Sequence, residues 1–383
     1  MEPFPRGKAA IVSAATFGIG EMPDYSAIDL GAKAAVAAVA AAGLQLGDID
    51  AVFSSFPSDF FGLAAAEYLG IQPRLNNNNR PGGSAFMTHV IHAANALATG
   101  ACDAALILYG SNQRSASGKL VAVPRHAPFE SEYKARYPIS SYALAAARHM
   151  HEYGTTREHL AEVAVAARGW ANLNPEAFAR GPLTIEDCLN ARMVSDPLSV
   201  QDCCLVTDGA AAIVMTRADR ARDLVAEPVY VLGGASATWH NDYIAAMPDL
   251  TVTAAQESGA RAFGQSGYQP GDVDVLQLYD AFTLNTILFL EDLGFCPKGE
   301  GGRFVEGGRI GPGGSLPVNT NGGGLSCVHP GMYGLFAITE CVRQLQGVCG
   351  ERQVPGAKLG IAHGNGVILS NQATLVLGTG DTL

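Results

Sequence analysis

The sequence predicts an α/β fold in which a mixed, largely parallel sheet is covered by helices, and it predicts that this arrangement occurs twice. Short apolar segments of strand length alternate with longer segments of helical period. The composition, with 48% hydrophobic and 16% charged residues, is that of a globular chain with a well-buried interior. After Arg222 the pattern starts again, which indicates an internal duplication.

In the first part of the chain, three apolar segments have the length of strands and two longer segments have helical period. The helix over 84–99 has almost no charge, so we expect it to be buried on all sides. The segment before it, "NNNNRPGGS", has the form of a loop that presents functional groups at a helix N-terminus. The expected strands are 8–16, 49–57 and 103–111, and the expected helices are 26–43 and 84–99.

Residues 112–196 differ from the segments on either side. Charged residues, histidine and tyrosine become more frequent, as in "PRHAPFESEYKARYP", and a helix is expected over 141–154. We interpret this region as a helical insertion that lies over the sheet and covers the substrate. The chain returns to the sheet with a strand in "AAAIVMT" before residue 217.

The second part repeats the order of the first. The segment 228–238 repeats the first strand, 272–283 repeats the second strand with its acidic turn, and 329–347 repeats the buried helix. Residues 357–378 are expected to form two closing strands joined by a glycine-rich turn. Ligands bind at the carboxyl ends of parallel strands in folds of this class, so we look for the site there.

Composition and charge exclude several classes of function. The net charge of −11 argues against a nonspecific nucleic-acid binder, which needs basic patches. No segment reaches the length of a membrane span, and the N-terminus lacks the apolar core of a signal peptide. The eight cysteines include no C-x-x-C pair, so we expect reduced thiols and no metal site. These features favour a cytoplasmic protein that does not bind membranes or nucleic acids.

Four motifs in order resemble the thiolase superfamily, in particular the sterol-carrier-protein-type thiolases and their thiolase-like relatives. The resemblance covers nearly the whole chain. The motifs are "DGAAAIVMT" (208–216), "LYDAFTLNTILFLEDLGFC" (278–296), "LPVNTNGGGLSCVHPGMYG" (316–334) and "AHGNGVILSNQATLVLG" (362–378). The second resembles the segment that carries the family's Asn-Glu-Ala-Phe or His-Asp-x-Phe signature, and the third resembles its Gly-His-Pro motif.

This resemblance implies the thiolase fold, with duplicated halves that build five layers, α-β-α-β-α. The N-terminal half would be 1–222, including the insertion at about 112–196, and the C-terminal half would be 223–383. The resemblance also implies a homodimer. It implies no cofactor apart from the CoA that is part of an acyl-CoA substrate.

The departures from the family pattern indicate a different reaction. Arg80 lies at or near the position of the family's nucleophilic cysteine, and His363-Gly364-Asn365-Gly366 replaces the motif that holds the second cysteine. Arginine cannot carry an acyl group, so thiolytic acyl transfer is not expected. Retro-aldol cleavage of a β-hydroxyacyl-CoA needs no acyl-enzyme. The chain resembles the steroid side-chain aldolases of this family, which lack the cysteine and work with a small partner that has an OB-fold and a zinc ribbon; a heterotetramer would result.

Five residues in these motifs are the expected catalytic groups. Tyr279 would transfer a proton to or from the β-hydroxyl, unless it is only a buried tyrosine with a satisfied hydroxyl. His329 would hold the thioester oxygen or transfer a proton. Tyr333 would share a helical face with His329 and donate a proton to Cα, or pack within the helix. His363 and Asn365 would complete an oxyanion hole, or only shape a turn.

Two alternative functions remain open from the residues. The chain could be an acyltransferase that uses Cys327 or another thiol, because Cys327 and His329 would share one face of a strand. It could also be a non-catalytic subunit that binds lipid or acyl-CoA. We expect Cys203 and Cys204 to be core thiols, and Ser84 to be a helix cap rather than a nucleophile.

Overall fold

The computed structural model describes residues 4–56, 63–117, 130–241 and 243–383. Its centre is one nine-stranded sheet in the order β3-β2-β4-β7-β1-β8-β11-β10-β9. The strands from the first part of the chain are β1 (Ala9–Gly20), β2 (Ala51–Ser54), β3 (Leu75–Asn78), β4 (Ala104–Ser111) and β7 (Asp208–Arg217). Those from the second part are β8 (Val229–Thr238), β9 (Val275–Leu278), β10 (Leu359–Gly366) and β11 (Asn371–Gly378).

The sheet is mixed, but the expectation that it is largely parallel is wrong. Within the described residues, five of the eight strand pairings are antiparallel. The turn between β10 and β11 is only four residues long, which forces these strands to run in opposite directions. After β4, the insertion brings the chain back into the sheet at the end where β4 finishes. Strand β7 therefore runs antiparallel to β4.

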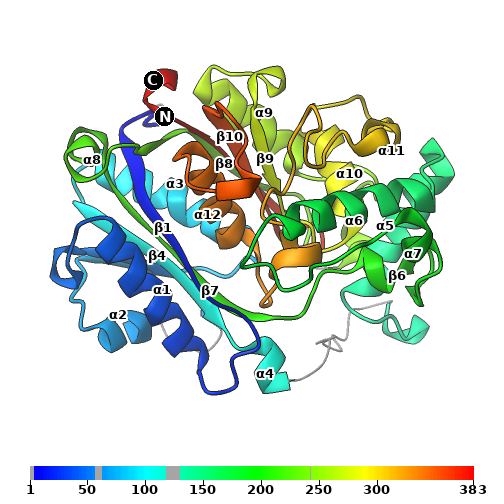
Figure 1. Ribbon diagram of the computed structural model, residues 1–383, viewed down its shortest axis with the longest axis horizontal. Coiled ribbons are helices and arrows are strands. Elements are labelled where there is room, and N and C mark those ends of the chain that lie inside the picture. Colours follow the sequence, from blue (N-terminus) through cyan, green and yellow to red (C-terminus); the bar gives the residue numbers. More distant parts are fainter. Residues whose placement is uncertain (1–3, 57–62, 118–129, 242) are drawn as a thin grey trace.

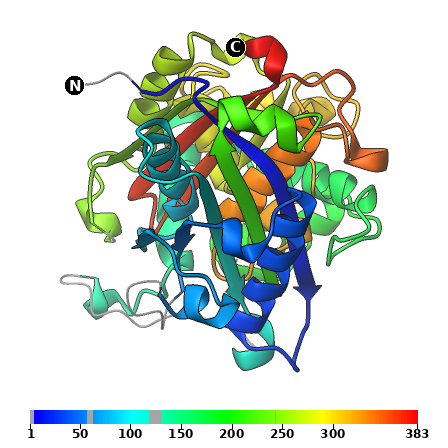
Figure 2. The same cartoon turned by 90° about the vertical axis from the view of Figure 1, so that its left-hand side faces the viewer.

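Helices form three layers around the strands of the two parts. Helix α1 (Ala27–Ala41) packs on the outer face of β1, β4 and β7, and Figure 2 shows it in front of these strands. Helix α9 (Ala255–Ser266) covers β8 and β11. Helices α3 (Ala85–Ala98) and α12 (Gly334–Leu345) contact each other and strands from both parts, so they form the central layer (Figure 1). The result is the expected α-β-α-β-α order.

The insertion is helical, as expected. Helices α5 (Ile139–Tyr153) and α6 (Arg157–Asn172) lie beside α10 (Thr283–Asp292) of the second part. A capping box at Thr156, whose hydroxyl accepts from the backbone N–H of His159, starts α6. A small two-stranded sheet of β5 (Met193–Ser195) and β6 (Leu198–Ser199) follows. The shorter helices are α2 (Leu63–Leu69), α4 (Gln113–Ser117), α7 (Ile185–Leu189), α8 (Ala218–Leu224) and α11 (Gly301–Phe304).

The boundary between the expected halves, after residue 222, falls inside α8, which leads from β7 to β8. The division into halves at this point stays our proposal, since β1 and β8 pair edge to edge and join both parts in one sheet. No helix in the described ranges has the length and apolarity that a bilayer span requires.

Candidate active site

A cavity of about 490 Å³ opens where the ends of several strands and helices converge. Its volume lies within the range of pockets that hold small ligands. It is bounded by the loop before α3, the segment after β9, the segment before α12, the end of β10 and the start of α5. Its wall includes Gly83, Tyr142, Cys203, Cys204, Tyr279, Phe282, His329 and Asn365.

Tyr279 follows β9 and is held against the loop before α3. Its backbone N–H donates to the carbonyl oxygen of His363 at 3.0 Å. A Cβ on Gly83 would lie 1.9 Å from Cε2 of the Tyr279 ring, so only glycine permits this contact. The loop that carries Arg80 therefore also carries the glycine that seats Tyr279.

Tyr279 and His329 form a hydrogen-bonded pair at the cavity. The Tyr279 hydroxyl lies 3.0 Å from Nε2 of His329 and accepts the backbone N–H of Tyr333 at 3.2 Å. Burial raises the pKa of the Tyr279 phenol well above its usual range and lowers the pKa of His329 to about 4. Both groups are therefore neutral at neutral pH, so the phenol can donate a hydrogen bond to an unprotonated Nε2 of His329.

Tyr333 lies behind Tyr279 rather than on a shared helical face with His329. Helix α12 begins only at Gly334, so residues 329–333 are not helical. The buried Tyr333 hydroxyl donates to Oδ1 of Asn321 at 2.9 Å. This differs from the expected role as proton donor to Cα, because the hydroxyl is directed to Asn321. Tyr333 reaches the site through its backbone N–H on Tyr279.

His363 is a core histidine in this structure. Nδ1 lies 2.9 Å from the hydroxyl of Thr374 and Nε2 lies 3.0 Å from Oε1 of Gln372. Burial lowers the pKa of His363 to about 3, so the ring is neutral. Both ring nitrogens are engaged, which differs from the expected place in an oxyanion hole. His363 supports the site through its carbonyl oxygen, which holds Tyr279.

Asn365 does line the cavity, and it contacts a residue that the sequence analysis missed. Its Nδ2 donates to the Tyr142 hydroxyl at 2.8 Å, and its Oδ1 accepts from Nε2 of Gln372 at 2.7 Å. Tyr142 lies near the start of α5 and packs on Phe282 with ring centroids 4.3 Å apart. The one feature of the sequence that could have indicated a role for Tyr142 was its position at the start of a helix expected to cover the substrate.

Two of the thiols, Cys203 and Cys204, are placed differently from our expectation. Cys327 is buried outside this cavity, 3.5 Å from Nδ2 of Asn174, and burial raises its pKa well above the usual range. Cys203 and Cys204, expected in the core, line the cavity instead. Burial raises the pKa of Cys203 to about 12 and that of Cys204 well above its usual range. Thiols with such pKa values are poor nucleophiles at neutral pH.

Arg80 and Ser84 are two side chains of the loop before α3, and neither is placed as a nucleophile. Arg80 is exposed, and within the described residues it does not line the cavity. The Ser84 hydroxyl donates to Oδ1 of Asn371 and does not cap α3. The expected cap is therefore absent, and Ser84 instead joins α3 to β11. Across the described ranges, no three His, Cys, Asp or Glu side chains are grouped as a metal site.

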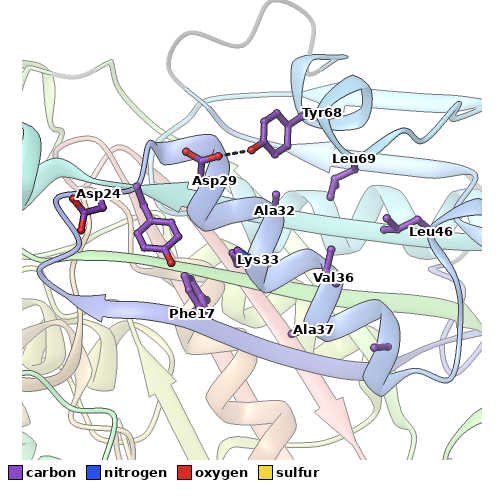
Figure 3. A pocket seen from close by; sticks show the side chains of 12 residues that line it. Phe17, Asp24, Asp29, Ala32, Lys33, Val36, Ala37, Leu46, Tyr68 and Leu69 are labelled. Atoms are coloured by element: carbon purple, nitrogen blue, oxygen red, sulfur yellow. Dashed lines mark hydrogen bonds between the residues drawn. The ribbon is translucent and has the colours of Figure 1, made fainter.

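A larger hollow of about 1010 Å³ lies elsewhere, along the outer face of α1 (Figure 3). Its wall is mainly apolar and includes Phe17, Val36 and Leu69, and a hydrogen bond from Tyr68 to Asp29 crosses one end. Its described lining residues all come from positions 17–69, far from the four motifs, whereas the smaller cavity gathers residues of three of them. The smaller cavity is therefore the candidate active site.

Comparisons with known proteins agree with the fold. The family model described as "Thiolase C-terminal domain-like" matches residues 235–379. The chain is 34% identical to an acetyl-CoA acetyltransferase of Methanothermobacter thermautotrophicus, over 93% of this chain and 96% of the relative. It is 36% identical to the 17-hydroxy-3-oxo-4-pregnene-20-carboxyl-CoA lyase of Mycobacterium tuberculosis, over 89% of this chain and 92% of the relative.

Among solved structures, the "Ltp2-ChsH2(DUF35) aldolase" superposes with a TM-score of 0.89 at 30% sequence identity, and the match covers 98% of both chains. The relatives thus include both an acyltransferase and carbon–carbon lyases. The choice between acyl transfer and carbon–carbon bond cleavage therefore depends on the chemistry of the residues at the site.

Proposed function

This chain belongs to the thiolase superfamily, and we propose that within it the protein is a carbon–carbon lyase that cleaves a β-hydroxyacyl-CoA by retro-aldol chemistry. The observation that carries the proposal is the neutral Tyr279–His329 pair at the cavity, combined with a vacated nucleophile position at Arg80. The relatives named as lyase and aldolase support the same reaction class.

The reaction needs one proton acceptor and one proton donor. The β-hydroxyl gives its proton to Tyr279 as Tyr279 passes its own to Nε2 of His329, across 3.0 Å. The Cα–Cβ bond breaks, a ketone or aldehyde leaves, and the bond's electron pair forms the thioester enolate. The proton returns from the pair to Cα, which yields the shortened acyl-CoA. The transient imidazolium offsets the negative charge of the enolate.

The substrate is proposed to be a bulky, apolar acyl-CoA of steroid type. The volume of about 490 Å³ and the apolar side chains at its wall, such as Phe282, suit such a group. The related lyase is named for a steroid-type CoA thioester. Apart from the CoA of the substrate, we propose no cofactor.

The assembly is proposed by analogy. The aldolase of similar structure is named together with a DUF35 protein, which supports our expectation of a small OB-fold and zinc-ribbon partner. A homodimer that binds two such partners would be a heterotetramer. All eight cysteines are free thiols, which fits the proposed cytoplasmic location.

The test is turnover of branched β-hydroxyacyl-CoAs by the chain with its partner, comparing wild type with Tyr279→Phe. We expect a carbonyl product and a shortened acyl-CoA from wild type, and a loss of roughly 10²–10⁴ in kcat in the variant. Tyr230→Phe is the matched control, because the Tyr230 hydroxyl contacts Arg222 rather than the cavity.

Two results would contradict the proposal. Thiolysis of a β-ketoacyl-CoA by free CoA, with no retro-aldol product, would favour an acyltransferase that uses a thiol; Cys204→Ala and Cys327→Ala would then locate it. Inactivity of the whole complex toward every β-hydroxyacyl-CoA and β-ketoacyl-CoA would favour a subunit that only binds acyl-CoA.

A further inference from the structure

A chain of buried hydrogen bonds runs from the sheet to the cavity and ends at Tyr142. His363 contacts Gln372, Gln372 donates to Asn365, and Asn365 donates to the Tyr142 hydroxyl at 2.8 Å. Residues 363, 365 and 372 lie on the β10–β11 hairpin, whereas Tyr142 comes from the insertion. All four side chains are buried.

Which group donates and which accepts along these hydrogen bonds is determined at the end that lies at the cavity. The Tyr142 hydroxyl donates to the carbonyl oxygen of Val367, which can only accept. The hydroxyl has one proton, so its oxygen must accept from Nδ2 of Asn365. Asn365 then presents its Oδ1 to Gln372, and Gln372 presents its Oε1 to Nε2 of His363. The four contacts are mutually consistent in this direction.

This arrangement leaves the hydroxyl proton of Tyr142 in a weak hydrogen bond. The contact with Val367 is 3.2 Å long, beyond the usual range of roughly 2.5–3.0 Å for an O–H···O hydrogen bond. Burial raises the pKa of Tyr142 to about 12, so the phenol keeps its proton at neutral pH. A better acceptor in the cavity can draw the proton away from Val367 without disturbing Asn365.

We propose that Tyr142 is a substrate-binding residue whose hydroxyl donates to the thioester carbonyl oxygen, the atom that carries negative charge in the enolate. This rests on the proposed function. In the proposed reaction, Tyr279 and His329 accept the proton of the β-hydroxyl and return a proton to Cα. The thioester oxygen therefore needs a separate hydrogen-bond donor. The hydrogen bond strengthens as charge develops, so it acts mainly on kcat rather than on KM.

The first test compares Tyr142→Phe with wild type in the complete complex. Phenylalanine keeps the packing on Phe282 and removes only the hydroxyl. We expect kcat to fall by about 10–10³-fold with KM changed less than about threefold, while Tyr230→Phe stays at the wild-type rate. A kcat within about threefold of wild type, or a higher KM at unchanged kcat, would overturn the proposal.

The second test keeps the tyrosine and reverses the hydrogen-bond direction. In the variant Asn365→Asp the new carboxylate can only accept, so the Tyr142 proton turns to this carboxylate and away from the substrate. We expect a loss of kcat similar to that of Tyr142→Phe, and little further loss in the double variant. Independent, additive losses in the two variants would show that Tyr142 does not act through its donated proton.

A binding measurement separates this inference from the proposed reaction. Wild type and Tyr142→Phe are titrated with a saturated acyl-CoA and with its thioether analogue, in which a methylene replaces the carbonyl. Because the hydrogen bond is weaker before charge develops, we expect wild type to prefer the thioester only slightly, by up to about threefold, and Tyr142→Phe to lose that preference, whether or not any substrate is cleaved. An unchanged preference in the variant overturns the role of Tyr142; a missing retro-aldol reaction overturns only the proposed function.

Discussion

At the scale of single residues, the absence of one Cβ determines where Tyr279 lies. The ring of Tyr279 occupies the space that a side chain at Gly83 would need, with a nominal separation of 1.9 Å. Neither atom can move away easily: the Cβ would be attached directly to the backbone, and Cε2 of Tyr279 belongs to the ring of a residue held by hydrogen bonds to His363 and His329. A larger residue at 83 must therefore move the catalytic pair.

We predict that Gly83→Ala lowers kcat by at least about tenfold and destabilises the protein by about 1–3 kcal/mol, the usual range for an overpacked site. The measurements are steady-state turnover and chemical denaturation. Gly47→Ala is the control, because a Cβ there meets nothing within 4 Å and the substitution should leave both quantities unchanged. Wild-type turnover in Gly83→Ala would show that Tyr279 does not need its present position.

At the scale of elements, a buried charge cluster fixes the insertion to the second part of the chain. Glu291 on α10 lies 3.1 Å from Nε2 of His149 on α5 and 3.0 Å from Nζ of Lys298. It also accepts the backbone N–H of Gly301 at 2.8 Å. Because α5 carries Tyr142 to the cavity, this cluster determines how the insertion covers the site.

We predict that Glu291→Gln costs about 1.5–3 kcal/mol, the range for hydrogen bonds to charged groups, and lowers turnover along with it. Glu152→Gln is the matched control on α5 itself, since its pair with Arg148 is solvent-exposed and should contribute less than about 0.5 kcal/mol. Equal stability of Glu291→Gln and Glu152→Gln in urea denaturation would contradict this account.

At the scale of the whole molecule, the interior holds histidines that must stay neutral. Burial lowers the pKa of His89 and His363 to about 3 and that of His329 to about 4. In the unfolded chain their pKa values are near ~6.5. Between these values the unfolded state binds more protons than the folded state, so stability is lost as the pH falls from about 6.5 toward 4.

We predict that, for each such histidine, the free energy of unfolding decreases by up to about 1.4 kcal/mol for each pH unit by which the pH falls across this window. His89 tests it outside the active site: its ring lies between Phe53 and Phe86, and neither nitrogen has a hydrogen-bond partner among the described residues. His89→Leu should raise stability at pH 7 by about 1 kcal/mol and flatten the acid limb of a thermal-denaturation series. An unchanged slope against pH would refute the prediction.

Much of this molecule could be read from local sequence. The helix expected over 84–99 is α3 at Ala85–Ala98, and that expected over 141–154 is α5 at Ile139–Tyr153. The resemblance of four motifs to the thiolase superfamily implied the family, and that resemblance together with Arg80 led to the proposed reaction class. Periodicity and residue chemistry are properties of neighbouring positions, so the chain reveals them without its fold.

Tertiary structure decided which partner each buried polar group meets. Tyr142 and Asn365 are 223 residues apart, yet their hydrogen bond places a new donor at the cavity. Nearer contacts, 12 residues apart for Tyr333 and Asn321 and across the β10–β11 hairpin for His363, direct these two side chains away from the roles expected of them. A buried donor or acceptor must find a partner, and only the packing of distant segments determines which one is within reach.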